Sequence, residues 1–234
     1  MKQEFDEYIE GYRTNCDQYL TLSGETSTYF AEYKAQKLKE WLGNKVCAPS
    51  HILDFGCGDG IMTHFVQSEF PHAKLYGVDP SPKSIETAKN QFQDIHFSLS
   101  SEETVKLKFE DSFFDIIFSA GVFHHIPFDQ HKGYVQELIR ILKPGGHLIL
   151  FELNPLNPLT VLTFKRNPID QHAHMMSPYY TRSLTKQYGK TKTKFYCFYP
   201  KLFSWLRPTE PYITKVPFGA LYATITQKDS QRNR

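Results

Sequence analysis

The chain of 234 residues is long enough to bury the core of one large domain without a disulfide or a metal to stabilise it. Its four cysteines lie far apart with no C-x-x-C pair, which argues against a disulfide scaffold and a zinc knuckle and favours a reducing compartment. The formal net charge of +2 hides an asymmetry, because residues 1–180 carry a net −7 and residues 181–234 a net +9.

The N-terminal segment and the apolar runs bear on location and partners. Residues 1–10 contain four acidic residues and no apolar run, so they do not predict a secretory signal. Apolar stretches such as residues 148–151 are too short to span a bilayer, and we expect a cytoplasmic protein. The basic C-terminal quarter indicates attraction of an anionic substrate or surface, and an ordinary solvated face is the alternative.

The first two thirds of the chain alternate between short apolar runs and longer periodic ones. A helix is expected over residues 28–42, ended by Gly43. Ser81 as N-cap and Pro82 at the first helical position predict the start of another helix. Strands are expected at 51–55, 74–79, 95–97, 114–118 and 147–152, and further helices at 61–70, 82–92 and 129–142. This alternation predicts an α/β fold whose parallel sheet is covered on both faces.

The C-terminal third has a different pattern. Residues 153–177 are rich in Asn, Pro and His and are expected to form a long loop or lid. A helix is expected over 178–188, followed by strands at 194–199 and 220–227 that can pair antiparallel and extend the sheet. We expect a single domain over 1–234, with a helical cap (1–48), a cofactor-binding core (49–152), a lid (153–177) and C-terminal strands with substrate-side elements (178–234).

The most informative segment is a glycine-rich turn at the end of the first strand. Gly56, Gly58 and Gly60 allow a tight bend and a close approach of the backbone to a ligand. Ligands bind at this edge of open parallel sheets, where the next helix begins. A dinucleotide fingerprint G-x-G-x-x-G would place its third glycine at position 61, which is Ile61, so the spacing differs from that motif.

A carboxylate follows at the end of the second strand. Asp79 lies 19 residues beyond Gly60, where it can accept two hydrogen bonds from a ribose diol. The alternatives without a ligand are an ordinary loop for the three glycines and a strand-ending turn for Asp79. Their joint occurrence on the expected elements favours a nucleoside-binding site.

These segments resemble motifs of the class I S-adenosylmethionine-dependent methyltransferases. Residues 53–60 (Leu-Asp-Phe-Gly-Cys-Gly-Asp-Gly) resemble the first motif and residues 77–81 (Gly-Val-Asp-Pro-Ser) the second. Residues 114–126 are similar to the fourth-strand motif, and residues 142–148 to the turn before the fifth strand. The resemblance covers about 50–152. It implies a Rossmann-like, doubly wound sheet of seven strands, mostly parallel with a reversed final strand, in three α/β/α layers.

The resemblance also implies the cofactor S-adenosylmethionine and its contacts. The turn from Gly56 to Gly60 would cradle the methionine portion and Asp79 the ribose. The residues expected at the cofactor are Asp54, Gly56, Cys57, Gly58, Gly60, Asp79, Pro80, Ser101, Glu102, Ser119, Ala120 and Phe123. The segments 23–31 and 151–160 resemble one branch of the family, which is associated with sugar or cell-envelope pathways. The expected function is methyl transfer to a small-molecule acceptor.

Candidate acceptor-side residues flank this core. His124 and His125 follow the fourth strand, and His125 is the candidate general base because a histidine with a pKa near 6.5 can take a proton from a hydroxyl or ammonium. A loop histidine packed for shape is the alternative. Tyr12, Tyr29, His124 and Asn154 are the candidate substrate contacts. His172 and His174 could suggest a metal, but no ligand pattern of known spacing accompanies them, and no metal is expected.

Nine aromatic residues between 195 and 222 stand among scattered lysines. They could stack on nucleobases or sugars or meet a membrane surface, and two edge strands plus core is the structural alternative. No nucleic-acid motif of recognised form appears. The acceptor is therefore expected to be small, partly apolar and anionic. A nicotinamide-dependent oxidoreductase and a non-catalytic cofactor-binding subunit remain the alternative functions.

Overall fold

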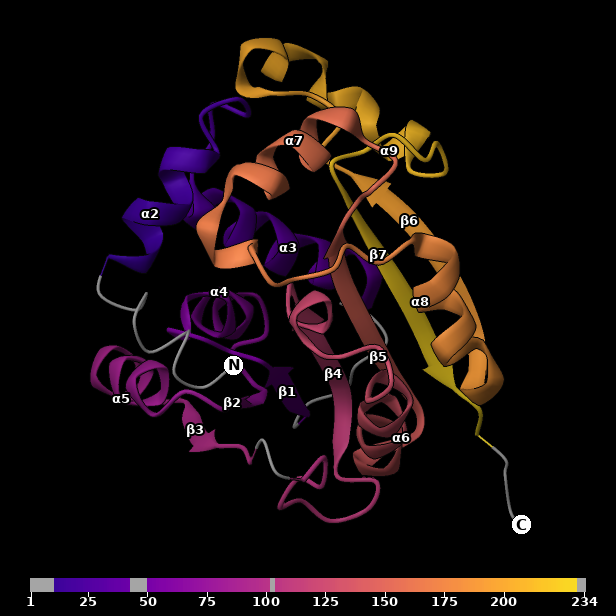
Figure 1. The fold of residues 1–234 in the computed structure, drawn as a ribbon. Coiled ribbons are helices and arrows are strands. Elements are labelled where there is room, and N and C mark those ends of the chain that lie inside the picture. The colour runs from indigo at the N-terminus through magenta and orange to yellow at the C-terminus, as the bar shows by residue number, and fades with distance from the viewer. Residues whose placement is uncertain (1–10, 43–49, 102–103, 231–234) are drawn as a thin grey trace.

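Seven strands form one sheet in the order β3-β2-β1-β4-β5-β7-β6 (Figure 1). The computed structural model describes residues 11–42, 50–101 and 104–230. The strands are β1 (His51–Phe55), β2 (Lys74–Asp79), β3 (His96–Leu99), β4 (Phe114–Ala120), β5 (Leu142–Leu153), β6 (Gly189–Tyr196) and β7 (Leu221–Lys228). Adjacent strands from β3 to β5 pair in parallel, and β7 pairs antiparallel with both β5 and β6. The expected sheet with its reversed final strand is confirmed.

Helices cover both faces of the sheet and the carboxyl ends of its central strands. The α-helices are α2 (Tyr12–Tyr19), α3 (Ser27–Leu42), α4 (Ile61–Glu69), α5 (Pro82–Gln91), α6 (His131–Ile141), α7 (Pro158–Arg166), α8 (Pro178–Thr185) and α9 (Glu210–Ile213). Short 3-10 helices are η1 (Phe123–His125), η2 (Pro168–Asp170), η3 (Lys186–Tyr188) and η4 (Lys201–Thr209). None of the helices in the described ranges is long and apolar enough to cross a membrane.

Alternate residues of the central strands point to two separate cores. Ile52 and Phe118 pack with α3, α4 and α5 on one face, whereas Leu53 and Ile117 pack with α6 and α8 on the other. The period of two along each strand puts neighbouring side chains on opposite faces. Both faces are therefore covered, which gives the three expected layers and leaves the carboxyl edge of the strands for ligands.

Two local interpretations from the sequence need correction. The segment 153–177 is not a loop throughout, because it holds α7 and η2. The Asn157 side chain accepts a hydrogen bond from the Thr160 amide and Pro158 occupies the first turn, which are ordinary signals of a helix start. The strand expected at 147–152 begins at Leu142, which pairs with Phe114 before residues 143–146 form an irregular insertion in the ladder.

The carboxyl edge of the sheet is overlaid by elements from both ends of the chain. In Figure 1, α2, α7 and η4 lie above this edge, beside the ends of β4 and β5. The proline-punctuated segment between β6 and β7 thus forms η4 and α9. The elements expected to carry the cofactor and the acceptor meet at one end of the molecule.

Candidate active site at the carboxyl edge of the sheet

The glycine turn leaves β1 tied to the end of β2. The amides of Gly56 and Cys57 both donate to the Val78 carbonyl, at 2.8 and 3.0 Å. Gly58 has a φ of +53°, and a Cβ added there would meet no heavy atom within 4 Å. The space beside Gly58 is therefore open, which is the geometry that a cofactor approaching the backbone requires.

Gly56 and Gly60 are explained by packing within the protein. Both have a φ of +79°, and a Cβ would run into the Val122 side chain at Gly56 and would lie 2.7 Å from the Phe97 ring at Gly60. The Cys57 side chain is also buried, in the core that α3 to α5 cover. Within the turn, Gly58 is thus the position that faces open space, and its neighbours hold it there.

Asp79 lies directly against this turn. Its two carboxylate oxygens accept hydrogen bonds from the Gly58 and Ser81 amides, each at 2.9 Å. An ionised carboxylate accepts about four hydrogen bonds, so Asp79 can hold both amides and still accept from the diol of a nucleoside. The open turn and the adjacent carboxylate fit the group expected from the sequence.

Asp54 supports the turn from below. Its carboxylate is buried and accepts a hydrogen bond from the Thr63 hydroxyl at 2.7 Å, which links β1 to α4. Burial raises the pKa of Asp54 to about 7, against the opposing effects of the Thr63 hydrogen bond and the nearby Lys34 ammonium. A buried carboxylate that resists ionisation is therefore part of the expected cofactor edge.

An ion pair connects α2 to the glycine turn. The Arg13 guanidinium donates two hydrogen bonds to Asp59, from Nε at 2.7 Å and from Nη2 at 2.5 Å. Both side chains are largely shielded from solvent. Such a two-point contact is stronger and more directional than a single surface ion pair. It fixes α2 beside the turn.

A cavity of about 250 Å³ opens beside the end of β4. Ala120 and Gly121 form its wall on the sheet side, and Val122, the next residue, packs against Gly56 of the glycine turn. Apolar side chains from five elements and from the end of α2 line most of it, namely Leu20, Phe30, Leu153, Leu159, Phe164, Ile169 and Leu221. The cavity is therefore an apolar chamber adjacent to the expected cofactor site.

Four of the residues that line this cavity are a lysine, two histidines and an aspartate. Lys34 reaches it from α3, and His124, His125 and Asp170 reach it from η1 and η2. Burial, followed by the repulsion of Arg13, lowers the pKa of Lys34, and the carboxylates of Asp54 and Glu152 oppose this effect. A cation and a group of titratable side chains in an apolar chamber can orient a polar acceptor group.

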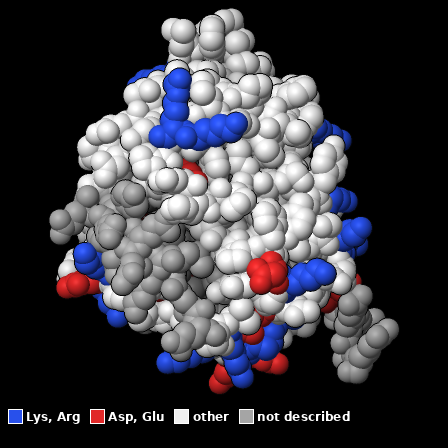
Figure 2. Space-filling model, viewed as in Figure 1, with Lys and Arg blue, Asp and Glu red and all other residues white. Residues whose placement is uncertain are grey.

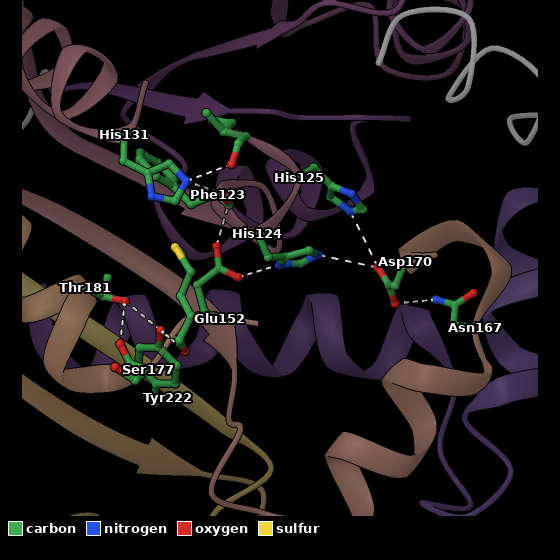
Figure 3. Close-up of polar contacts among 12 residues, drawn as sticks. Phe123, His124, His125, His131, Glu152, Asn167, Asp170, Ser177, Thr181 and Tyr222 are labelled. Atoms are coloured by element: carbon green, nitrogen blue, oxygen red, sulfur yellow. Dashed lines mark hydrogen bonds and ion pairs between the residues drawn. The ribbon is translucent and has the colours of Figure 1, made fainter. Parts of the chain in front are cut away.

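A buried chain of carboxylates and imidazoles crosses the end of β5 (Figure 3). His124 Nδ1 lies 2.5 Å from Glu152 Oε2, and His124 Nε2 lies 3.5 Å from Asp170 Oδ1. The other Glu152 oxygen accepts from the Phe123 amide at 3.0 Å, and Asn167 donates to Asp170 at 2.7 Å. His125 Nε2 lies 3.6 Å from the same Asp170 oxygen.

The two histidines differ in charge. Burial opposes a charge on His124, but the Glu152 and Asp170 carboxylates outweigh it and raise the pKa of His124 to about 10. Burial and then the charge of His124 lower the pKa of His125 to about 3, with Asp170 opposing. His124 is therefore a fixed cation between two carboxylates, and His125 is a neutral imidazole facing the chamber at neutral pH.

His124, His125 and Asp170 also have the composition of a metal-ligand set. Their ligating atoms lie within 4.8 Å of one another, the one such group in the parts of the chain that the structure describes. Because protonated His124 directs one ring N–H toward Glu152 and the other toward Asp170, we propose that this group holds no metal. His172 and His174 are exposed and do not join the group.

Several residues proposed from the sequence lie elsewhere. Asn154 does not line the chamber: its side-chain amide is buried and donates to the Pro217 and Gly219 carbonyls. Tyr29 lines a smaller neighbouring cavity, with Arg207 over its ring. Tyr12 begins α2, and its side chain lies outside the described residues, as does Glu102.

The remaining cofactor candidates differ in exposure. Pro80 and Ala120 are half-buried at the carboxyl edge, and Ser101 is exposed after β3. The Phe123 ring is fully buried against Phe55, so this residue contributes to the core that α6 and α8 cover. The Ser119 hydroxyl is buried and has no hydrogen-bond partner among the described residues.

Four residues of the site were not predicted: Arg13, Lys34, Glu152 and Asp170. Glu152 lies near the end of β5, the strand after β4, and Asp170 lies in the segment expected to form a lid. Neither residue therefore shares a local sequence pattern with His124. The end of a parallel strand was a signal for Glu152, because carboxyl ends of neighbouring strands meet at one edge. Arg13 and Lys34 follow no motif spacing.

Comparison with known proteins relates this edge to a catalytic domain. Residues 52–146 match the family model described as a methyltransferase domain. Malonyl-[acyl-carrier protein] O-methyltransferase of Hahella chejuensis is 32% identical over 101 residues, which cover 43% of this chain and 36% of that protein. Sterol 4-C-methyltransferase strm-1 of Caenorhabditis elegans is 31% identical over 164 residues, which cover 64% of this chain and 47% of that protein. The chain spans less than half the length of these two relatives.

Solved structures share the whole fold at low sequence identity. A SAM-dependent methyltransferase from Archaeoglobus fulgidus superposes with a TM-score of 0.69 at 15% identity, covering 87% of this chain and 95% of that one. At this identity the likeness concerns the fold. The shared fold and the domain match are consistent with a cofactor site at the glycine turn and Asp79.

Proposed function

The chain belongs, through residues 52–146, to the class I S-adenosylmethionine-dependent methyltransferases, whose cofactor is S-adenosylmethionine, and we propose that it methylates a small, partly apolar acceptor carrying a hydroxyl or acidic group. The observation that supports this proposal is the apolar chamber against Ala120 and Gly121, one residue from the contact between Val122 and the glycine turn. The acceptor and the cofactor would then meet at the end of β4.

The cofactor would be held by groups on both sides of the turn. The open space at Gly58 would take the methionine portion, and Asp79, which already accepts from the Gly58 amide, would accept from the ribose hydroxyls. When bound, the cofactor supplies a methyl group on a sulfonium, a good leaving group that needs little acid or base assistance. The main contribution of the chain is then to hold the acceptor in line with that methyl.

Lys34 and His125 supply the polar functions of the chamber. The Lys34 ammonium would attract an acidic acceptor, and neutral His125 would take the proton of an acceptor hydroxyl. Asp170, 3.6 Å from His125 Nε2, would stabilise the imidazolium so formed. Because His124 is already charged, it positions Asp170 and Glu152 and does not take this proton.

The acceptor class follows from the chamber's mixed lining. Of the two relatives, one is named for malonyl-[acyl-carrier protein] and the other for a sterol. An amphipathic precursor of the cell envelope or of a sugar conjugate would combine an apolar part for Leu159 and Phe164 with an anionic part for Lys34. We also propose a cytoplasmic location, in line with the thiol state of Cys57 and Cys197.

Calorimetry and turnover together test the proposal. The purified chain should bind S-adenosylmethionine and its demethylated product but not NAD, and Asp79→Ala should abolish that binding. Incubation with a panel of apolar acids, apolar alcohols and sugar phosphates should release demethylated product only with amphipathic members. Binding of NAD alone would contradict the family function, and cofactor binding without turnover on any acceptor would indicate a non-catalytic subunit.

A further inference from the structure

Large apolar side chains are exposed around η4, α7 and the loop before β7. We call these six residues the apical surface: Leu159, Leu162, Leu202, Trp205, Tyr212 and Phe218. Leu202 is 80% exposed, Trp205 74%, Tyr212 89% and Phe218 62%. No residue of η4 is buried, so packing of the core does not require the side chains of Leu202 and Trp205. Contiguous apolar surface of this kind marks an interaction site.

The parts of the apical surface are joined to one another. The Asn157 side chain, at the start of α7, donates to the Phe218 carbonyl at 2.7 Å. Leu159 of α7 and Arg207 of η4 line the same small cavity. Leu159 also lines the acceptor chamber. The apical surface is therefore continuous across α7 and η4 and reaches the entrance of the site.

The exposed charges that α7, η4 and the segment around α9 contribute beside this surface are positive, and Glu25 from the N-terminal part of the chain pairs with Arg207. Between residues 156 and 218 the two acidic residues, Asp170 and Glu210, are both buried. Exposed cations are Lys165 and Arg166 at the end of α7, with Lys201 and Lys215 beside η4 and α9. Figure 2 shows Lys and Arg gathered over α7, below an uppermost lobe that presents no charged side chain in this view.

We propose that the apical surface docks the protein onto an anionic lipid bilayer. Tryptophan and tyrosine with leucine and phenylalanine beside lysine and arginine make the pattern of an interfacial anchor, in which apolar groups enter the headgroup region and cations contact anionic lipids. The exposed cations Lys165, Arg166, Lys201 and Lys215 beside these apolar side chains match anionic headgroups, which favours a bilayer over a protein partner. The orientation would place the entrance of the chamber at the membrane. The inference rests on the surface alone and is independent of the proposed reaction.

Vesicle binding tests this inference. The purified chain should sediment with phosphatidylglycerol-containing vesicles at low salt and stay in solution with phosphatidylcholine vesicles. The double variant Leu202→Ser/Trp205→Ser should lose binding, whereas Tyr179→Ser should keep it, because Tyr179 is 75% exposed on α8 outside the surface. Lys165→Ala/Arg166→Ala should weaken binding roughly 30-fold, at about fivefold per lost charge.

Fluorescence gives a local readout. The chain has two tryptophans, and Trp41 is packed on Phe151 in the core. Anionic vesicles should therefore shift the emission of Trp205 to shorter wavelength, and Trp205→Phe should remove the shift while binding persists. Circular dichroism of the double variant should match the wild type, since η4 buries no residue.

Three results would overturn the inference. One is the absence of sedimentation with anionic vesicles at any salt concentration. Another is equal binding by the wild type and the double variant. A third is a stable dimer in light scattering that Leu202→Ser/Trp205→Ser converts to a monomer, which would assign the apical surface to a second copy of the chain.

Discussion

Gly58 and Gly60 are two residues apart, yet their surroundings in the structure differ. A Cβ at Gly58 enters open space, whereas a Cβ at Gly60 meets the Phe97 ring at 2.7 Å and Ala88 Cβ at 3.1 Å. Both positions have a positive φ, so alanine carries a similar backbone strain of about 1–2 kcal/mol at each. The difference between the two variants therefore isolates the space in front of the turn.

We expect Gly58→Ala to weaken binding of S-adenosylmethionine at least tenfold while the free energy of unfolding falls by only about 1–2 kcal/mol. Gly60→Ala should lower the free energy of unfolding further, because overpacking a core adds about 1–3 kcal/mol. Calorimetry and urea unfolding measure the two effects. Equal losses of affinity and stability in both variants would contradict this assignment.

The charge on His124 predicts a pH-dependent stability. Its pKa is raised to about 10 from about 6.5, so its stabilisation is fully present below pH 6.5 and is lost as the pH rises through 10. Glu152→Gln removes one carboxylate partner and should cost about 3–5 kcal/mol at pH 6, and less at pH 10. Urea unfolding at pH 6, 8 and 10 measures this.

A matched control for that experiment lies on α3. Glu40 pairs with Lys37 at an exposed position, so Glu40→Gln should change the free energy of unfolding by less than about 1 kcal/mol at every pH. If Glu152→Gln and the wild type lost stability in parallel between pH 6 and 10, His124 would not be the titrating group.

His125 is the residue whose role depends most on the proposed reaction. With a hydroxyl acceptor, His125→Ala should lower kcat roughly 100- to 10,000-fold, the usual contribution of a general base, and leave the affinity for S-adenosylmethionine unchanged. His174→Ala is the control, because His174 is exposed and does not line the chamber. Normal turnover by His125→Ala would exclude the role.

The limits of the sequence as a guide are clearest at this scale. The glycine turn and Asp79 belong to local patterns on consecutive strands, and the structure brings them into contact as the spacing indicated. Glu152 and Asp170 lie 28 and 46 residues beyond His124, and only the pairing of β4 with β5 and the position of η2 bring them together. The sequence predicts Asn154 as a substrate contact, but its side-chain amide donates to two carbonyls of a loop more than sixty residues away.

Whole elements were easier to predict than their termini or their caps. The helix at 82–91 begins where Ser81 and Pro82 indicated, with the Ser81 hydroxyl accepting from the Ser84 amide. Asn157 and Pro158 carry the same kind of signal, but the surrounding segment lacks the apolar periodicity that would predict a helix. The antiparallel pairing of β6 with β7 was expected, but η4 between them was not, because prolines obscured its pattern.

The attachment of α2 to the glycine turn predicts slow exchange of the cofactor. Arg13→Ala removes two charge-assisted hydrogen bonds to Asp59, and we expect S-adenosylmethionine to dissociate at least tenfold faster with a smaller effect on its association. Stopped-flow displacement by the demethylated product measures the rates. Lys37→Ala removes a cation of α3 that pairs with Glu40 and should leave them unchanged. Equal dissociation from Arg13→Ala and the wild type would show that α2 does not retain the cofactor.

At the scale of the whole molecule, charge is distributed unevenly, with +9 in residues 181–234. If the acceptor is anionic, its KM should rise several-fold between 0.05 and 0.5 M salt, because screening shortens the range of attraction from above 10 Å to a few ångström. An uncharged analogue of the same acceptor should show a flat profile. Parallel profiles for the two compounds would remove the anionic group from the proposal.

The direction of β7 has a practical corollary. Because this strand runs against its neighbours, it returns the backbone to the far rim of the sheet, where the Lys228 ammonium donates to the Ile139 and Leu142 carbonyls. A peptide handle joined after Lys228 would leave the molecule on the side away from η4 (Figure 1). Tethering by that handle to a sensor chip would leave the apical surface and the carboxyl edge of the sheet accessible to vesicles and acceptors in the flowing solution.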